Sequence, residues 1–394
     1  MSTREVFVLS AARTAIGTFG GALKDVPLTQ LATTAVKEAL VRSGVAAADI
    51  GHVVMGNVIP TDTRDAYLSR VAAIEAGIPK ETPAFNVNRL CGSGLQAVVS
   101  AAQTLLLGEA EFAIGAGAEA MSRGPYFMNG ARWGARMGDA VATDYMLGIL
   151  HDPFGKIHMG ITAENVAAQE GITREVQDQV AVESHRRAAA AIAEGRFKSQ
   201  IVPVELVTRK GTTLFEVDEH VRADTSLDQL AKMKPAFKKD GTVTAGNASG
   251  LNDGAAALVL ASGDAVKARG LKPMARLVSY AHAGVEPSLM GLGPVPATQL
   301  ALKRAGLKVS DLDVIESNEA FAAQACAVTR KLDLDPAKVN PNGSGISLGH
   351  PVGATGAIIA TKAIYELQRV GGRYALVTMC IGGGQGIAAI FERV

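Results

Sequence analysis

The stretch CGSGLQAVVSAAQTLLLGEAEFAIG, residues 91–115, predicts a buried helix, a glycine turn and a strand. Residues 92–107 contain no charged side chain, and a helix so poor in charge is typical of one buried on all sides. Gly108 marks the turn, and Glu111–Gly115 is a short apolar run of strand character. We therefore expect an α/β protein with a helix packed inside it.

The pattern occurs a second time. Residues 350–378 read HPVGATGAIIATKAIYELQRVGGRYALVT, which again predicts a helix, a glycine turn and a strand. Two such units predict duplicated halves, with Cys91 and His350 at equivalent helix entrances. Further strands are predicted at Val6–Leu9, Val53–Gly56, Ala256–Leu260, Ala275–Tyr280, Val314–Glu316 and Ile387–Phe391, and further helices at Leu28–Arg42, Arg64–Ala76, Arg174–Glu194 and Pro296–Arg304.

The middle of the chain differs from both halves and predicts an insertion. We expect residues 1–120, completed by 244–270, to form the first half and residues 271–394 to form the second. Residues 121–243 carry most of the loop-like sequence and form the inserted segment.

Composition narrows the function classes. The chain has 394 residues, a formal net charge of +1 and three cysteines. It offers no electrostatic argument for nucleic acid or an anionic membrane and no disulfide framework. We see no leader peptide, no apolar run of the roughly 18 residues that a membrane span needs, and no peroxisomal signal at Val394. A cytoplasmic enzyme is the expectation.

Three reactive side chains stand in glycine-rich surroundings. Cys91 precedes a predicted helix, whose N-terminus should favour the thiolate. His350, with Pro351 at the first helical position, could accept its proton. Cys380 precedes three glycines whose N–H groups could bind an oxyanion, or its thiol could act as acid or base.

Other candidates have structural alternatives. Asn318 could orient a water or a substrate carbonyl, or simply cap the following helix. Cys326 lies on an apolar helical face and is expected in the core. Gly92–Ala97 fits a permissive dinucleotide pattern but lacks the acidic residue expected about twenty positions later. A metal site is disfavoured because no paired ligand spacing is present.

Four segments together resemble the signature blocks of the thiolases, specifically the acetyl-CoA acetyltransferases. They are Asn88–Gly94, Asn318–Phe321, Gly349–Gly356 and Cys380–Gly386. The resemblance covers the whole chain and is greatest to bacterial β-ketothiolases of polyhydroxyalkanoate-producing organisms, of the broad-specificity type. It implies two duplicated βαβαβαββ halves in a five-layered α-β-α-β-α arrangement, with an inserted loop domain.

The resemblance also implies a mechanism. Cys91 takes an acyl group as a thioester after activation by His350, and Cys380 then removes the α-proton of a second acyl-CoA. One oxyanion hole combines His350 with a water held by Asn318, and the other uses the N–H groups of Cys91 and Gly382. Coenzyme A thioesters are then substrates, and no separate cofactor or metal is expected.

The resemblance further implies which residues contact coenzyme A and how copies assemble. The pantetheine arm is expected to contact Leu150, His158, Met159, Ala248, Ser249, Met290, Ala320 and Phe321, with Arg222 near the nucleotide. The segment around Arg123–Asp144, which includes Trp133, matches the loop that builds homotetramers in this family.

One departure and two other functions remain to be weighed. Many relatives read Asn-Pro-x-Gly-Gly-Ala-Ile-Ala where this chain has Asn340–Ser347, a change that could alter the acyl pocket or the local backbone.

A decarboxylating ketoacyl synthase shares the fold but uses one cysteine, so Cys380 argues against it. A non-catalytic acyl-CoA-binding or lipid-transfer protein would require a lost nucleophile or base, and none is lost.

Overall fold

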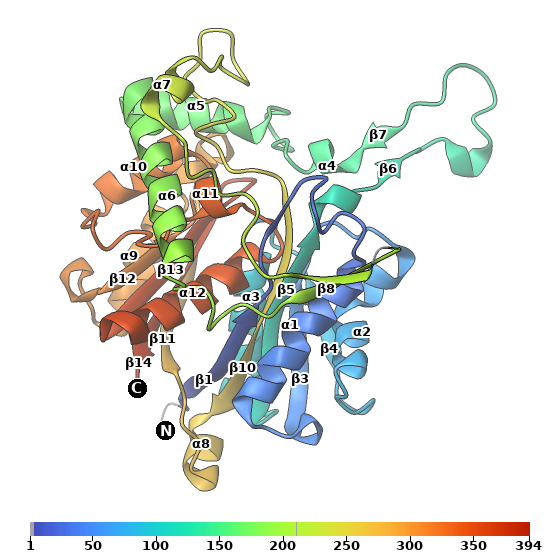
Figure 1. The fold of residues 1–394 in the computed structure, drawn as a ribbon, viewed down its shortest axis with the longest axis vertical. Coiled ribbons are helices and arrows are strands. Elements are labelled where there is room, and N and C mark those ends of the chain that lie inside the picture. The colour runs from blue at the N-terminus through green and yellow to red at the C-terminus, as the bar shows by residue number, and fades with distance from the viewer. Residues whose placement is uncertain (1–3, 210) are drawn as a thin grey trace.

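The computed structural model describes residues 4–209 and 211–394. Its main feature is a sheet with the strand order β12-β13-β14-β11-β1-β10-β5-β3-β4, with short β2 (Gly17–Thr18) added beside β10 (Figure 1). The first-half strands are β1 (Val6–Arg13), β3 (Ile50–Gly56), β4 (Ala84–Val87), β5 (Phe112–Ala120) and β10 (Asn252–Ser262). The second-half strands are β11 (Ala275–Gly284), β12 (Val314–Ser317), β13 (Tyr374–Ile381) and β14 (Gln385–Arg393).

The two halves repeat the same strand arrangement. From the centre outward, β1-β10-β5-β3 in the first half corresponds to β11-β14-β13-β12 in the second. Corresponding pairs also share their direction, because β3 and β5 are parallel, as are β12 and β13. An antiparallel pairing of β1 with β11 joins the two halves. The predicted duplication is therefore confirmed at the level of topology.

Helices complete the layers. Helix α3 (Ser93–Leu107) and helix α12 (Thr355–Val370) contact each other and strands of both halves, so they form the central layer. Helices α1 (Leu28–Ser43) and α2 (Leu68–Glu75) cover the outer face of the first half, and α9 (Pro294–Ala305) covers that of the second. The five-layered thiolase arrangement expected from the sequence is confirmed.

The central helices approach closely because both carry glycine in their first turn. A Cβ placed on Gly356 would lie 2.1 Å from the backbone nitrogen of Leu95, and one on Gly94 would lie 2.7 Å from that of Ala357. Residues 90–107 form an 18-residue stretch apolar enough to cross a membrane by length and composition, contrary to the expectation from the sequence. Most of helix α3 is buried between the two halves, which accounts for its apolar character.

The remaining elements lie between β5 and β10 or flank the strands. The segment between β5 and β10 includes β6 (Tyr126–Phe127), β7 (Thr143–Asp144), α4 (Tyr145–Gly148), α5 (Met159–Gln169), α6 (Arg174–Ala193), β8 (Val204–Thr208), β9 (Gly211–Phe215) and α7 (Leu227–Ala231). Elsewhere the chain forms α8 (Gly263–Arg269), α10 (Ala322–Lys331) and α11 (Gly345–Leu348). Strands β6 and β7 belong to an arm that projects from the body (Figure 1).

Candidate active site

Cys91 is held on a tight turn directly before helix α3. Leu90 adopts a left-handed backbone with φ of 46°, a conformation that costs a non-glycine residue of the order of 1–3 kcal/mol. The Ser93 hydroxyl stabilises the turn by donating to the Leu90 carbonyl oxygen at 2.7 Å and accepting from the Arg89 N–H at 2.8 Å. The turn presents the half-buried Cys91 beside the apolar cluster that contains Val352.

Cys380 approaches Cys91 from the other half. It is a fully buried residue near the end of β13, followed by a turn in which Gly383 and Gly384 both have positive φ. The backbone N–H of Gly382 is near enough to the Cys91 thiol to act against the rise in its pKa. A Cβ on Gly382 would lie 3.2 Å from the Met159 side chain, so glycine keeps this approach open. Two thiols almost three hundred residues apart in sequence thus belong to one site.

The pKa values of the two thiols are raised, whereas the sequence predicted a lowered pKa for Cys91. Burial raises the pKa of the Cys91 thiol to about 11, and the Glu119 carboxylate acts in the same direction. The prediction of a lowered pKa was wrong for the unacylated protein, because desolvation outweighs the helix terminus and the N–H of Gly382. Burial, together with the charge of Cys91, also raises the pKa of Cys380 above its ordinary value.

The His350 imidazole is buried and uncharged at neutral pH. Burial lowers the pKa of its imidazole to about 4, so the ring is neutral at pH 7. Its Nδ1 lies 2.7 Å from the Thr355 Oγ1, and the Asn318 Nδ2 lies 3.5 Å from both ring nitrogens. The sequence predicted that His350 opens the following helix, and this prediction was wrong. Helix α12 begins at Thr355, because the chain first makes a turn closed by hydrogen bonds from Ala354 and Thr355 to the Pro351 carbonyl oxygen.

Asn318 is not a helix cap. The following helix α10 is preceded by Phe321 and has no side-chain cap. The Asn318 residue is fully buried, and its Oδ1 has no hydrogen-bond partner among the described residues. A buried amide beside the His350 ring with a free acceptor is suited to a small polar ligand such as a water.

An apolar wall extends from Cys380 and contains most of the residues expected to hold pantetheine. It consists of Met159, Ala163, Val243, Ala248, Met290, Ala320, Phe321 and Cys380. Ser249 joins it through a backbone hydrogen bond to Ala320, and Leu150 through one from Met159. Ala248 and Phe321 are bridged through their backbones.

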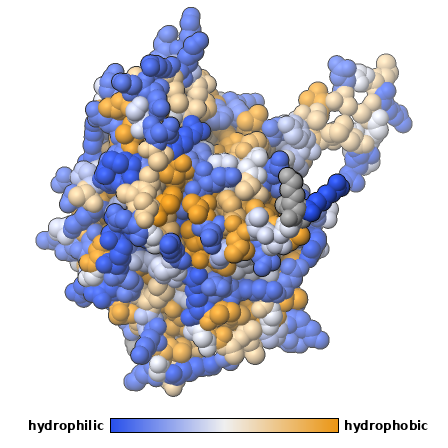
Figure 2. Space-filling model, in the orientation of Figure 1, coloured by the Kyte–Doolittle hydropathy of each residue, from blue (hydrophilic) through white to orange (hydrophobic). Residues whose placement is uncertain are grey.

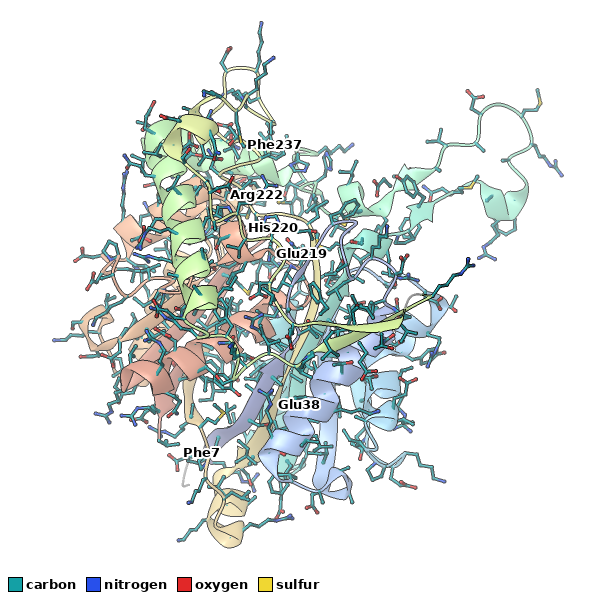
Figure 3. The ribbon with its side chains drawn as sticks, in the orientation of Figure 1. Phe7, Glu38, Glu219, His220, Arg222 and Phe237 are labelled. Atoms are coloured by element: carbon teal, nitrogen blue, oxygen red, sulfur yellow. The ribbon has the colours of Figure 1, made fainter. Side chains whose placement is uncertain are left out.

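Phe237 is a member of this wall that the sequence reasoning missed. Its ring stacks on His158 with centroids 4.6 Å apart and meets Phe321 edge-on at 6.3 Å. In Figure 3 it lies above the segment that carries His220 and Arg222. Its only sequence signal is an aromatic residue within the charged run 232–239.

Arg222 lies apart from the apolar wall. It lines a cavity of about 320 Å³ together with His185, His220, Asp224 and Ile346. Its backbone N–H donates to the His185 Nδ1 at 3.1 Å. The predicted set of residues therefore divides between an apolar wall that includes Cys380 and a polar cavity that includes Arg222.

The divergent segment 340–347 lies behind Asn318 rather than beside Cys91. The Ser184 hydroxyl donates to the Glu319 carboxylate at 2.6 Å and lies 2.8 Å from that of Ser347. The Ser344 hydroxyl reaches the Ser317 carbonyl oxygen at 3.4 Å. These serines therefore support the backbone that carries Asn318. Cys326 is a core residue, as predicted.

Comparisons with known proteins agree with this geometry. Residues 6–264 match the thiolase N-terminal domain, and residues 271–393 match the thiolase C-terminal domain. The chain belongs to the thiolase family. The β-ketothiolase BktB of Cupriavidus necator is 67% identical over the full length of both chains. The mitochondrial 3-ketoacyl-CoA thiolase of Homo sapiens is 47% identical over 99% of this chain and 98% of its own.

Solved thiolase structures superpose on the whole chain. The crystal structure of human mitochondrial 3-ketoacyl-CoA thiolase has a TM-score of 0.98 at 47% identity and covers 100% of both chains. The structure of the human enzyme in complex with CoA has a TM-score of 0.96 at 46% identity, covering 100% of this chain and 98% of its own. The sequence-based predictions of a thiolase fold and of a thiolase-type acyltransferase are confirmed.

Proposed function

We propose that this thiolase is an acetyl-CoA C-acetyltransferase of the β-ketothiolase type. It condenses two short-chain acyl-CoA molecules to a 3-ketoacyl-CoA and free CoA, and it catalyses thiolysis in reverse. The observation that carries this proposal is the pairing of Cys91 with Cys380 beside the Gly382 N–H. A decarboxylating synthase needs only one thiol, whereas a Claisen condensation of this kind needs a nucleophile and a carbon base.

In the first step, neutral His350 accepts the Cys91 proton as the thiol attacks the acyl carbonyl carbon. The new sulfur–carbon bond replaces the bond to the CoA sulfur, and the proton passes from His350 to the departing CoA thiolate. A Cys91 pKa near 11 requires such a base, because few thiolates form unaided at pH 7.

In the second step, the thiolate form of Cys380, which burial makes the minor form at pH 7, removes the α-proton of a second acyl-CoA. The resulting carbanion attacks the acyl-Cys91 carbonyl, so a carbon–carbon bond forms while the Cys91 sulfur–carbon bond breaks. The departing Cys91 thiolate takes up the proton that Cys380 removed, which restores both residues to their starting states. Acylation of Cys91 must come first, because the carbanion attacks the acyl-Cys91 carbonyl.

Two donor sets would stabilise the oxyanions of the two steps. His350 and a water held by Asn318 bind the thioester oxygen of the acyl-CoA that forms the carbanion. The backbone N–H groups of Cys91 and Gly382 bind the oxygen of the tetrahedral intermediate on Cys91. The N–H of Gly382 already favours the ionised form of the Cys91 thiol, which supports the second assignment.

The apolar wall and the Arg222 cavity would bind coenzyme A. The pantetheine arm contacts Leu150, His158, Met159, Ala248, Ser249, Met290, Ala320 and Phe321, and Arg222 lies near the nucleotide. Phe237 belongs with them because it stacks on His158. The solved complex of the human thiolase with CoA, which superposes on the whole chain, supports this ligand.

We further propose that this cytoplasmic enzyme is a homotetramer assembled through the projecting arm. Within the arm, Trp133 is 80% exposed, Met137 is 97% exposed and Val141 is 73% exposed, an apolar surface that a monomer rarely keeps (Figure 2). The arm and the coenzyme A wall both draw on residues 121–243, which we regard as a loop domain inserted into the first half.

The first test is a thiolysis assay at fixed CoA that follows acetoacetyl-CoA and 3-ketovaleryl-CoA side by side. Strong preference for four carbons would identify a dedicated acetyl-CoA acetyltransferase, and comparable rates would identify the broad-specificity type. Cleavage of neither would refute the proposed function.

A variant pair tests the division of roles. Cys380→Ser should spare transfer of acetyl to Cys91 more than it spares carbon–carbon bond formation. Acetyl incorporation from radiolabelled acetyl-CoA and acetoacetyl-CoA formation would be measured separately. Equal loss in both half-reactions would contradict the assignment of Cys380 as the carbon base.

A further inference from the structure

Glu119 is a buried carboxylate that the reaction steps above do not use. It lies near the carboxyl end of β5 and is fully buried. Strand β5 corresponds to β13 of the second half, whose carboxyl end carries Cys380. The two corresponding strand ends therefore direct one thiol and one carboxylate toward the same region, because Glu119 acts on the pKa of Cys91.

Each hydrogen-bond partner that the described residues give this carboxylate is a donor. Oε1 accepts from the Asn57 Nδ2 at 2.8 Å and the Ile59 N–H at 3.0 Å. Oε2 accepts from the Val58 N–H at 3.1 Å and the Gly353 N–H at 2.8 Å. No cation pairs with Glu119 within residues 4–209 and 211–394. Burial without a counter-ion raises the pKa of Glu119 to about 8, although the N–H bonds act in the opposite direction. The four directed bonds, rather than a fixed charge, are therefore its more informative property.

These bonds reach across the two halves. Glu119, Asn57 and the residues after it belong to the first half, whereas Gly353 ends the turn that begins at His350. A Cβ on Gly353 would lie 2.4 Å from the Glu119 Oε2, so glycine is required for the carboxylate to approach the backbone. Glu119 therefore fixes one end of the His350 turn.

Asn252 fixes the other end. Its Oδ1 accepts from the His350 N–H at 2.8 Å. Asn252 lies on β10, which pairs with β5 so that Gly254 is opposite Glu119. Two buried side chains on neighbouring first-half strands thus hold the turn at its first and fourth residues.

We propose that Glu119 is a positioning residue, which through Gly353 holds the His350 turn of the second half in register with Cys91 of the first. Among the described residues, the hydrogen-bonding partners of the His350 ring are Thr355 and Asn318, and Thr355 itself follows the turn. The ring orientation therefore depends on the backbone that Glu119 and Asn252 hold. This inference rests on the proposed role of His350 as the base for Cys91.

The test is the rate at which iodoacetamide alkylates Cys91 between pH 4 and pH 8, with the modified residue identified by mass spectrometry. This readout does not require turnover. In Glu119→Gln one carboxylate oxygen is replaced by an NH₂ group, which cannot accept a hydrogen bond. Because each oxygen of Glu119 accepts from two N–H donors, either orientation of the amide loses two of the four bonds. We expect alkylation at pH 7 to slow about tenfold, because His350, the proposed base, is no longer aligned with the Cys91 thiol.

The sign of the change separates positioning from other effects. The ionised fraction of Glu119 raises the pKa of Cys91, so loss of that charge would by itself lower the pKa of Cys91 and speed alkylation. General loosening of the fold would also speed alkylation. The other titratable groups near the turn are Cys380 on β13, Asp253 on β10 and His220, which lies 3.5 Å from Asn252. None of them changes in the variant.

Two further variants complete the experiment. Glu164→Gln alters another buried carboxylate that accepts backbone N–H groups, from Thr242 and Val243, and should keep the wild-type alkylation rate per folded protein. Asn57→Ala removes one of the four donors to Glu119 and should slow alkylation about threefold. If Glu119→Gln does not fold, the alkylation rate of Asn57→Ala tests the positioning role instead.

Unchanged or faster alkylation in folded Glu119→Gln, or in Asn57→Ala where that variant decides, would overturn the inference. Thiolysis by the wild-type protein is measured in parallel. Its absence, with the alkylation pattern intact, would refute the proposed function while leaving the positioning role supported.

Discussion

Replacing Gly356 by alanine tests whether the two central helices must touch for the site to form. The added methyl would lie 2.1 Å from the backbone nitrogen of Leu95, where ordinary contacts begin at about 3.4 Å. A backbone nitrogen cannot rotate away as a side chain can. Helices α3 and α12 must therefore move apart by about 1 Å to admit the methyl.

Two opposing effects determine how much Gly356→Ala changes the free energy of unfolding. Alanine gains up to about 1 kcal/mol over glycine in a helix. Overpacking of a rigid contact costs about 3 kcal/mol, at the upper end of the usual range. We expect a net loss of about 2 kcal/mol in the free energy of unfolding.

The catalytic effect should be larger than the loss of stability implies. Cys91 precedes α3 and His350 precedes α12, so separating the helices separates the proposed nucleophile from the proposed base. A misplacement of about 1 Å at a reacting pair can cost about 100-fold in rate. We expect kcat for thiolysis to fall by that order while the KM for CoA stays within about twofold, because the apolar wall around Met159 does not involve Gly356.

The assay combines urea unfolding with acetoacetyl-CoA thiolysis. Gly263→Ala is the matched control, because Gly263 also begins a helix but an added Cβ there meets its nearest atoms at 3.4 Å. Wild-type stability and turnover in Gly356→Ala would refute the reasoning, since it would mean that the helices do not depend on this contact.

Three further predictions concern the site and the arm. Cys91→Ser should lower turnover at least 1,000-fold yet leave CoA binding measurable by calorimetry, and unchanged activity would disprove its nucleophilic role. His350 takes up a proton near pH 6.5 in the unfolded chain but only near pH 4 in the folded chain. The free energy of unfolding should therefore fall by up to about 3 kcal/mol as the pH is lowered from 6.5 to 4. His350→Asn should lose that part of the pH dependence in urea titrations at pH 7 and 4.5, and an unchanged dependence would contradict it. If the proposed tetramer forms through the exposed arm, Trp133→Asp should shift the native mass from tetramer toward dimer in light scattering, and an unaltered mass would exclude Trp133 from the interface.

Much of the site could be predicted because its chemistry is carried by short sequence segments. Cys91, His350 and Cys380 each stand beside glycines, and glycine next to a reactive side chain is visible without a structure. The apolar helix after Cys91 likewise indicated its own burial. The structure then brought Cys380 and Gly382 to Cys91, as their shared surroundings had suggested.

Other features were beyond local pattern. Burial raises the pKa of Cys91, where the helix terminus alone predicted a fall, because desolvation depends on the whole surrounding protein. His350 precedes its helix by five residues, although Pro351 is well suited to a helix start. Phe237 and Asn252 gave no motif at all, because their contacts are to residues distant in sequence.

The sequence by itself determined the α/β class, the duplicated halves and the identity of the two thiols and the imidazole. These follow from periodicity and from residue type, which are local properties. The tertiary structure decided how the halves join through β1 and β11, how the central helices meet at Gly94 and Gly356, and which buried groups hold the His350 turn. Those features depend on distances between residues far apart in the chain, and only the packed structure fixes such distances.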